Sequence, residues 1–487
     1  MTDLLTKISK KRQIVIAGAG LIGSTMAIAL ASKGLDVTVV DGTSEEDRIE
    51  RNKGRTYALS RTSKNLLINL DLWDPKRLKV SPIENIILST RKNSSDMKRH
   101  LVEFNKEPNE VGPSSYMIED FYLRKVLASE LKRNTKIQLI NSTEVIDDQT
   151  NSFETKIMLS DKSLISTEIF IISDGRESGF AKRLNKTFFK KNYNQLAIVG
   201  NLSHENEHNF VAHQLFLSGG PLAVLPLKGK RATFVWSLPI ELGNKITNSN
   251  DEKFIDYLKD NIGDILTNLA LIGEKKTFPL YLRFLRDTID NRKVFIGDSA
   301  QAIHPLAGQG LNLGFRDVAS LVDILLNGKK LGLDLGSNHL LKQYESWRSF
   351  DRISLATYTD FINALFSNDN FYLKTLRELG MNALVFSDQS KPPPPVNPMS
   401  ADRVKWEHIQ RIFELCNRNV SETARRLNMH RRTLQRILAK RSPRKYLYCL
   451  RSSGRFPYSP AASFTKKLFN RSDLSTAFIP SSLRVFR

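Results

Sequence analysis

The chain has 487 residues, 40% of them hydrophobic, with a formal net charge of +22 and only two cysteines. This length suggests two or three domains, and two cysteines exclude a disulfide framework, so a reducing cytoplasm is the expected location. No run approaches the roughly 18 apolar residues of a membrane-spanning helix, and the N-terminus lacks a signal-peptide pattern, so any membrane contact is expected to be peripheral.

The excess of positive charge lies in the last fifth of the chain. Residues 391–487 hold 21 Lys and Arg against 5 Asp and Glu, a net charge of +16, whereas the first 390 residues have a net charge of +6. The basic character therefore belongs to a C-terminal segment and says little about the rest of the protein.

The first recognisable unit, residues 13–41, reads strand, glycine-rich turn, helix and strand. In this pattern Gly18 permits the tight bend, Gly20 lets the backbone approach a pyrophosphate, and Gly23 allows close helix–strand packing. The phosphates would face the amides of the helix N-terminus, and the carboxylate of Asp41 is placed to accept bonds from ribose hydroxyls. GxGxxG alone is a weak motif. The prediction of a dinucleotide site therefore rests on the strand, turn, helix, strand and acidic residue occurring in this order.

The middle of the chain alternates predicted strands and helices, which favours an α/β domain. Helices are expected over Asp120–Lys132 and Lys253–Asn268, among others. The polar region around 190–290 contains short apolar runs and predicts a separate sheet that closes over the first domain. Asp174-Gly175 follows another apolar strand and by itself indicates only a turn.

A second glycine-rich turn follows a strand that ends at Gly297. The carboxylate of Asp298 is suited to bind a ribityl or ribose hydroxyl, and we expect it to be buried against such a partner. Two such turns could hold the two ends of one dinucleotide, its pyrophosphate and its long polar tail, which points to a flavin cofactor. The loop continues through His304 and Pro305 into a helix starting near Leu311, whose amides can stabilise the negative charge of the reduced flavin. His304 either approaches the flavin ring or is a structural histidine. The predicted cofactor contacts here are Gly297, Asp298, Gly308, Gln309, Gly310, Leu311 and Asn312.

Together, residues 10–388 resemble the flavoprotein aromatic hydroxylases of the para-hydroxybenzoate hydroxylase type. In that family the first turn binds the FAD pyrophosphate, the Asp174-Gly175 motif contacts both FAD and NAD(P)H, and the last motif binds the ribityl chain. Gln301 departs from the histidine of many relatives in the wider family. The segments that look like the ubiquinone-biosynthesis branch are Arg55–Ser60, Ser218–Leu227, Gly297–Asp317, Tyr344–Arg348 and Phe366–Asp369.

The resemblance implies a Rossmann-like FAD-binding domain with an inserted β-sheet substrate domain. It also implies that NAD(P)H reduces FAD, that O2 forms a C4a-hydroperoxide, and that one oxygen atom enters the ring of a polyprenylphenol precursor of ubiquinone. Arg55 would lie near the flavin, and no metal or side-chain nucleophile is expected. A biosynthetic complex is a further expected partner, while the oligomeric state stays open. The implied boundaries are 10–80, 100–185 and 285–388 for FAD binding, and about 81–99 and 190–284 for the substrate sheet.

Four prolines, residues 392–395, mark a boundary, because prolines cannot continue a helix and favour a stiff spacer over 391–400. Residues 401–444 have helix–turn–helix form, with an apolar face on each of two short helices. The polar face of the second helix either reads bases and phosphates in a DNA major groove or is the solvated surface of a small bundle. The candidate DNA contacts are His430, Arg431, Arg432, Gln435 and Arg436.

The proline linker and helical segment resemble the Fis-type DNA-binding domain of the RegA/PrrA/ActR-type redox response regulators. Nothing in residues 1–390 resembles the receiver domain of those regulators. The chain thus looks like a hydroxylase joined to an effector domain, by a natural fusion or by a join between two genes, with an unassigned and disordered tail over 445–487. The alternative functions are a flavin-linked redox-sensing transcription regulator and a flavin reductase or dehydrogenase without oxygenation.

Overall fold

The computed structural model describes residues 12–91, 99–104, 112–113, 115–217, 219–303 and 308–366, and residues 409, 413, 416, 419–427 and 429–439 of the C-terminal part. Internal contacts divide the chain into two units, Met1–Lys391 and Pro392–Arg487, and each is described by itself. Within these described ranges, no helix is both long and apolar enough to cross a membrane.

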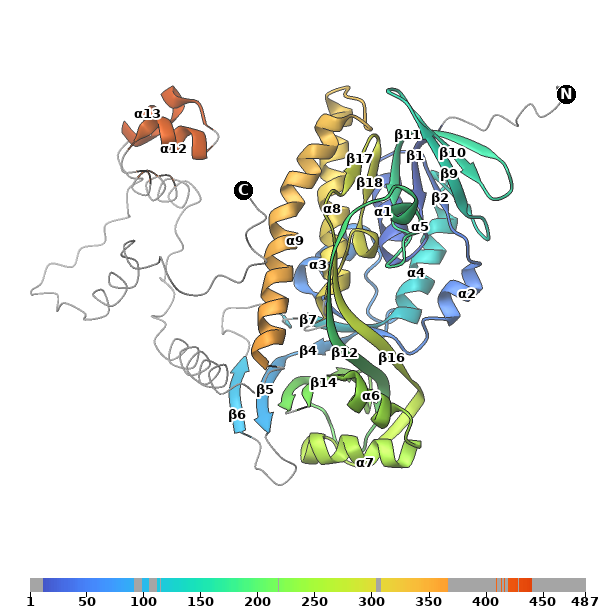
Figure 1. Ribbon diagram of the computed structural model, residues 1–487, viewed down its shortest axis with the longest axis vertical. Coiled ribbons are helices and arrows are strands. Elements are labelled where there is room, and N and C mark those ends of the chain that lie inside the picture. The colour runs from blue at the N-terminus through green and yellow to red at the C-terminus, as the bar shows by residue number, and fades with distance from the viewer. Residues whose placement is uncertain are drawn as a thin grey trace, which may run out of the picture. The chain divides into compact units, whose positions relative to one another are not determined.

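An eight-stranded sheet forms the centre of the first unit, in the order β17-β18-β11-β1-β2-β8, with β10 and β9 added beside β11 (Figure 1). The five strands from β18 to β8 are parallel neighbours. Their near-continuous apolar runs suit strands that are covered on both faces. The bounds are β1 (Arg12–Ala17), β2 (Val37–Val40), β8 (Ile137–Ile140), β9 (Val145–Thr150), β10 (Thr155–Leu159), β11 (Leu164–Ile172), β17 (Ile289–Asp290) and β18 (Lys293–Phe295).

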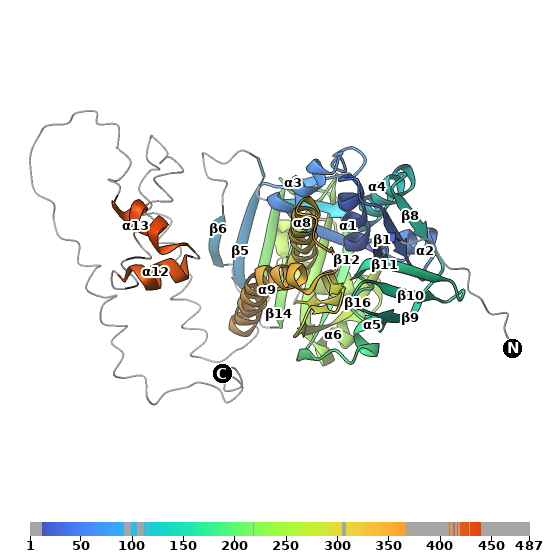
Figure 2. The same ribbon diagram turned by 90° about the horizontal axis from the view of Figure 1, so that it is seen from above.

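Helices pack on this sheet through one large apolar core. The helix α1 is buried nearly all round and contacts both α4 and α8, while α9 lies along α8 (Figures 1 and 2). Two short helices begin at serine caps, where Ser44 accepts the amide hydrogen of Asp47 and Ser60 accepts that of Ser63. The bounds are α1 (Leu21–Ala31), α2 (Glu45–Glu50), α3 (Arg61–Asn69), α4 (Asp120–Arg133), α5 (Gly179–Arg183), α8 (Gln309–Lys330) and α9 (Asn338–Phe366).

A second eight-stranded sheet has the order β19-β16-β12-β15-β14-β13-β5-β6, and α6 and α7 help to cover one of its faces. Its two longest strands, β12 and β16, pair with each other along most of their length (Figure 1). The bounds are β5 (Asn85–Arg91), β6 (Arg99–Phe104), β12 (Phe188–Ser203), β13 (Val211–Leu217), β14 (Gly220–Leu227), β15 (Arg231–Pro239), β16 (Ala270–Leu285), β19 (Gln301–Ala302), α6 (Ile240–Thr247) and α7 (Asp251–Ile262).

Two details of the predicted middle region are wrong. The expected short strands are present as β14 and β15, but the 16-residue strands β12 and β16 were not predicted, because polar positions interrupt their apolar runs and their pairing is irregular. The expected helix over Lys253–Asn268 ends at Ile262, because Gly263 follows with φ +59° and a short 3-10 turn leads into β16. The α/β class predicted for this unit is confirmed.

A three-stranded sheet of β3 (Thr56–Ser60), β7 (Ser115–Glu119) and β4 (Ser81–Ile83) contacts the second large sheet and the helix α8. The hydroxyl of Thr56 donates to that of Thr233 in β15 at 3.2 Å, and Asn312 of α8 accepts the Ser60 amide at 2.9 Å. These bonds bring the start of α8 and the second sheet together around β3.

In the second unit, α12 (Val420–Arg426) and α13 (Arg431–Ala439) share a small apolar core. Asn419 caps α12 by accepting the amide hydrogens of Ser421 and Glu422. The apolar side chains of this core are Ile409, Val420, Ala424, Leu427, Met429, Leu434 and Leu438.

Candidate active site

The three glycines of the first turn differ in the space available beside them. A Cβ atom on Gly18, which has φ +100°, would lie 2.5 Å from the carbonyl oxygen of Ser173, and one on Gly23 would lie 1.9 Å from the carbonyl oxygen of Gly18. A Cβ on Gly20 would meet nothing within 4 Å. Packing thus requires two of the glycines, while Gly20 borders open space at the N-terminus of α1, where a pyrophosphate can approach.

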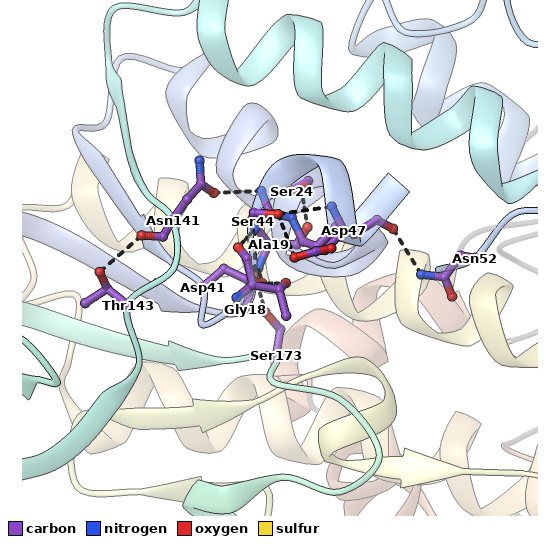
Figure 3. A network of polar contacts seen from close by, with 12 residues as sticks. Gly18, Ala19, Ser24, Asp41, Ser44, Asp47, Asn52, Asn141, Thr143 and Ser173 are labelled. Atoms are coloured by element: carbon purple, nitrogen blue, oxygen red, sulfur yellow. Dashed lines mark hydrogen bonds and ion pairs between the residues drawn. The ribbon is translucent and has the colours of Figure 1, made fainter. Parts of the chain in front are cut away.

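Asp41 lies directly against this turn, beside Gly18 and Ala19 (Figure 3). Its Oδ2 accepts the Ala19 amide hydrogen at 2.6 Å, and its Oδ1 accepts that of Thr43 at 2.8 Å and pairs with Arg48 at 3.1 Å. A carboxylate oxygen can accept more than one bond, so Oδ2 retains room for a ribose hydroxyl. Sequence reasoning missed Arg48, because nothing in its polar helix distinguishes it from a surface arginine.

The Asp174-Gly175 loop follows β11 and lies next to the same turn, since a Cβ on Gly18 would also lie 3.1 Å from the Cα of Asp174. Gly175 has φ +87°, which favours glycine. Burial raises the pKa of the Asp174 carboxyl, while the hydrogen bond from Ser178 opposes this rise. Its Oδ1 is buried without a hydrogen-bond partner among the described residues, which fits a site that a bound donor completes.

The second turn places Asp298 differently from the sequence expectation. Its side chain is 42% exposed rather than buried, and Arg176 approaches it at 3.9 Å. Its neighbours Gly297 and Ser299 are buried, and Ser299 donates to the carbonyl of Ile172 at 2.8 Å. The turn is therefore held through those two residues, which leaves the Asp298 carboxylate open to a ligand.

Arg55 lies in a cluster of charged and aromatic side chains at the start of β3. Its guanidinium lies 5.1 Å from the centre of the Tyr57 ring, and the Tyr57 hydroxyl donates to Asp120 at 2.9 Å. Asp120 also pairs with Arg124 one helical turn later. Tyr57, Asp298 and Asp120 raise the pKa of Arg55, while burial raises the pKa of Tyr57. A fixed positive charge therefore lies within reach of the Asp298 turn.

The start of α8 is tied to β3 by Asn312. Its side-chain oxygen accepts from the Ser63 hydroxyl at 2.7 Å, and its nitrogen donates to the Ala58 carbonyl at 2.8 Å. Gly308 begins the helix with φ +61°. The predicted contacts of Asn312, Gly308, Gln309, Gly310 and Leu311 with the cofactor stay predictions, and His304 and Pro305 lie outside the described residues.

Residues 11–351 match the protein family described as FAD binding domain. The chain belongs to this family of FAD-dependent monooxygenases. Ubiquinone hydroxylase UbiL of Rhodospirillum rubrum is 32% identical over 77% of this chain and 86% of the relative. The 3-demethoxyubiquinol 3-hydroxylase of Escherichia coli is 27% identical over 76% of this chain and 94% of the relative.

Solved monooxygenase structures share the fold of this enzyme. PqsL of Pseudomonas aeruginosa superimposes with a TM-score of 0.65 at 18% identity, over 77% of this chain and 100% of that one. The p-nitrophenol 4-monooxygenase PnpA of Pseudomonas putida gives 0.63 at 14% identity, over 78% and 98%. The predicted FAD-dependent oxidoreductase class is confirmed.

The described residues of the monooxygenase fit FAD. The open space before Gly20 suits a pyrophosphate, the unpartnered oxygen of Asp174 suits a donor group, and the exposed carboxylate of Asp298 suits a sugar-alcohol hydroxyl. Because Asp174 lies beside Gly18 and Arg176 beside Asp298, all three motifs border one region of the first unit.

Proposed function

We propose that this enzyme hydroxylates the aromatic ring of a polyprenylphenol precursor in ubiquinone biosynthesis, with NAD(P)H and O2 as co-substrates. The observation that carries the proposal is the meeting of the Gly18, Asp174 and Asp298 motifs at one site. The names of the UbiL and demethoxyubiquinol hydroxylase relatives support the substrate class.

The residues of this chain would bind and orient FAD, which when bound supplies the redox chemistry with NAD(P)H and O2. The amides at the start of α1 would hold its pyrophosphate and Asp298 its ribityl chain. The positive charge of Arg55 would favour negative charge that develops nearby.

A buried apolar cluster lies beside the start of α8. It joins the three-stranded sheet to the second large sheet and includes Met117, Ala212 and Leu227, with Ala58 packed against it. A Cβ on Gly308 would lie 3.3 Å from the Cβ of Ala58, so the cluster borders the second glycine-rich turn. Such surroundings would exclude water from the reacting ring.

Oxygen incorporation tests this proposal. Purified enzyme given NAD(P)H, a short-chain polyprenylphenol and isotopically labelled O2 is expected to release a product with one labelled oxygen atom on the ring. The same reaction without the phenol is the control for uncoupled NAD(P)H oxidation. NAD(P)H oxidation that the phenol stimulates without label in the product would instead support a reductase or dehydrogenase.

For the C-terminal unit, we propose DNA binding through α13. Leu434 of this helix is buried, whereas the residues on its other side are exposed, and the helix contains no acidic residue. A cationic helix face without acids suits phosphates and base edges. The proposed contacts are His430, Arg431, Arg432, Gln435 and Arg436.

Substitution of Arg432 tests the DNA proposal. Arg432→Ala is expected to weaken binding of duplex DNA about tenfold or more, since a phosphate or base contact is lost, and to lower the salt dependence of the affinity. Fluorescence anisotropy of labelled DNA measures both. Arg425→Ala is the matched control, because Arg425 lies on α12 and pairs with Glu422. Equal losses in the two variants would argue against α13 as the binding helix.

The same assay with oxidised and reduced flavin tests whether the flavin state of the enzyme controls DNA binding. A change in DNA affinity on reduction would favour the redox-sensing regulator, whereas equal affinities would mean that the two units act independently.

A further inference from the structure

The turn that carries Asp298 is held at both ends by buried charged side chains. At its start, the amide of Gly297 donates to Oδ2 of Asp317 at 3.0 Å. At its end, the carbonyl of Ala300 accepts from Nη2 of Arg352 at 3.3 Å. Asp317 lies on α8 and Arg352 on α9, so the turn is fixed against two different helices.

The side chain of Gln301 joins these two anchors. Its Nε2 donates to Oδ2 of Asp317 at 2.8 Å, and its Oε1 accepts from Nε of Arg352. A carboxylate can only accept and a guanidinium can only donate, so this amide has one permitted orientation. Gln301 is only 4% exposed, so water cannot readily replace either bond.

The hydrogen bonds of Gln301 matter because they join buried charged side chains. Asp317 accepts from Arg348 at 2.7 Å, and Arg348 pairs in addition with Asp351. The contacts that the structure gives the Arg352 guanidinium are the Gln301 oxygen, the carbonyls of Leu285 and Ala300, and the ring of Phe284. Gln301 therefore connects Arg352 by hydrogen bonds to the buried carboxylate that its charge requires.

We infer that Gln301 is a positioning residue for Asp298. By joining Asp317 to Arg352, it fixes both ends of the turn and thereby presents the Asp298 carboxylate to FAD. The inference rests on the proposed role of Asp298 in cofactor binding, and it gives a function to an amide at the position where histidine is common in the wider family.

A double-mutant cycle between Gln301→Met and Asp298→Ala tests the inference, with the FAD affinity of the apoprotein as readout. Methionine keeps the length of the side chain but makes neither hydrogen bond. Each single substitution is expected to weaken FAD binding about tenfold, on the scale of a lost hydrogen bond to a charged group. If Gln301 acts through Asp298, the double variant binds little more weakly than Asp298→Ala alone.

Gln343→Met is the matched control, because Gln343 lies on the exposed side of α9 outside the network, and its FAD affinity is expected to equal that of the wild type. Thermal unfolding of each apoprotein is recorded in parallel. Additive losses in the cycle, or wild-type affinity of Gln301→Met, would overturn the inference. Wild-type affinity of Asp298→Ala would overturn the role of Asp298 itself, which separates the two failures. If Gln301→Met does not fold, Gln301→Glu replaces it, because an ionised Glu keeps the acceptor for Arg352 but cannot donate to Asp317.

Discussion

The Gly20→Val variant is expected to fold with the stability of the wild type and to bind FAD at least about 100-fold more weakly, a loss of about 2.7 kcal/mol. Apart from its neighbours in the chain, no described atom lies within 4 Å of a Cβ on Gly20, so the apoprotein has room where the added side chain begins. It would instead fill the space before the α1 amides that we assign to the pyrophosphate. Flavin absorbance of the purified protein and fluorescence titration of the apoprotein with FAD measure the loss.

Two further glycine variants control this prediction. Gly20→Ala fills less of the space and is expected to fall between wild type and Gly20→Val in FAD affinity. Gly23→Ala is expected to lower the free energy of unfolding of the apoprotein instead, because its Cβ would lie 1.9 Å from a carbonyl oxygen. A Gly20→Val protein that purifies with bound flavin would show that the pyrophosphate is not held at this turn.

The parts of the site that the sequence predicts correctly are those that neighbouring residues determine. The strand, turn, helix and strand that carry Gly18 and Asp41 follow one another within thirty residues, and the structure has them in that order. The strand before Asp298 and the helix after it were also predicted, because apolar periodicity reveals each of them. The boundary of α7 was missed, since Gly263 ends the helix through its backbone angle while apolar residues continue beyond it.

The parts that could not be predicted depend on side chains that meet only after folding. Asp298 was expected to be buried against a ligand hydroxyl, because a buried carboxylate needs a partner. The carboxylate that is buried belongs instead to Asp317, nineteen residues later. Asp317 lies on α8, whereas its partners Gln301 and Arg348 come from β19 and α9. Arg48 and Asn141 are joined across 93 positions in the same way. No local pattern marks such residues, because their spacing reflects tertiary structure rather than a helix or strand period.

Asp317→Leu is expected to lower the free energy of unfolding of the first unit by about 3–5 kcal/mol, the usual cost of removing one partner from a buried ion pair. The substitution leaves the guanidiniums of Arg348 and Arg352 buried without this carboxylate, and the Gly297 amide loses its acceptor. Urea unfolding of the apoprotein measures the change, with Asp360→Ala as control. Asp360 forms a partly exposed pair with Lys191, so its removal is expected to cost at most about 1 kcal/mol.

The same variant is also expected to bind FAD more weakly, because the Asp298 turn loses its anchor on α8. Gly20→Val should change FAD affinity alone, whereas Asp317→Leu should change FAD affinity and stability together. The two variants therefore distinguish a residue that borders the cofactor from one that holds the Asp298 turn. An Asp317→Leu protein within about 1 kcal/mol of wild type would contradict this assignment, since a dispensable carboxylate could not be what fixes the turn.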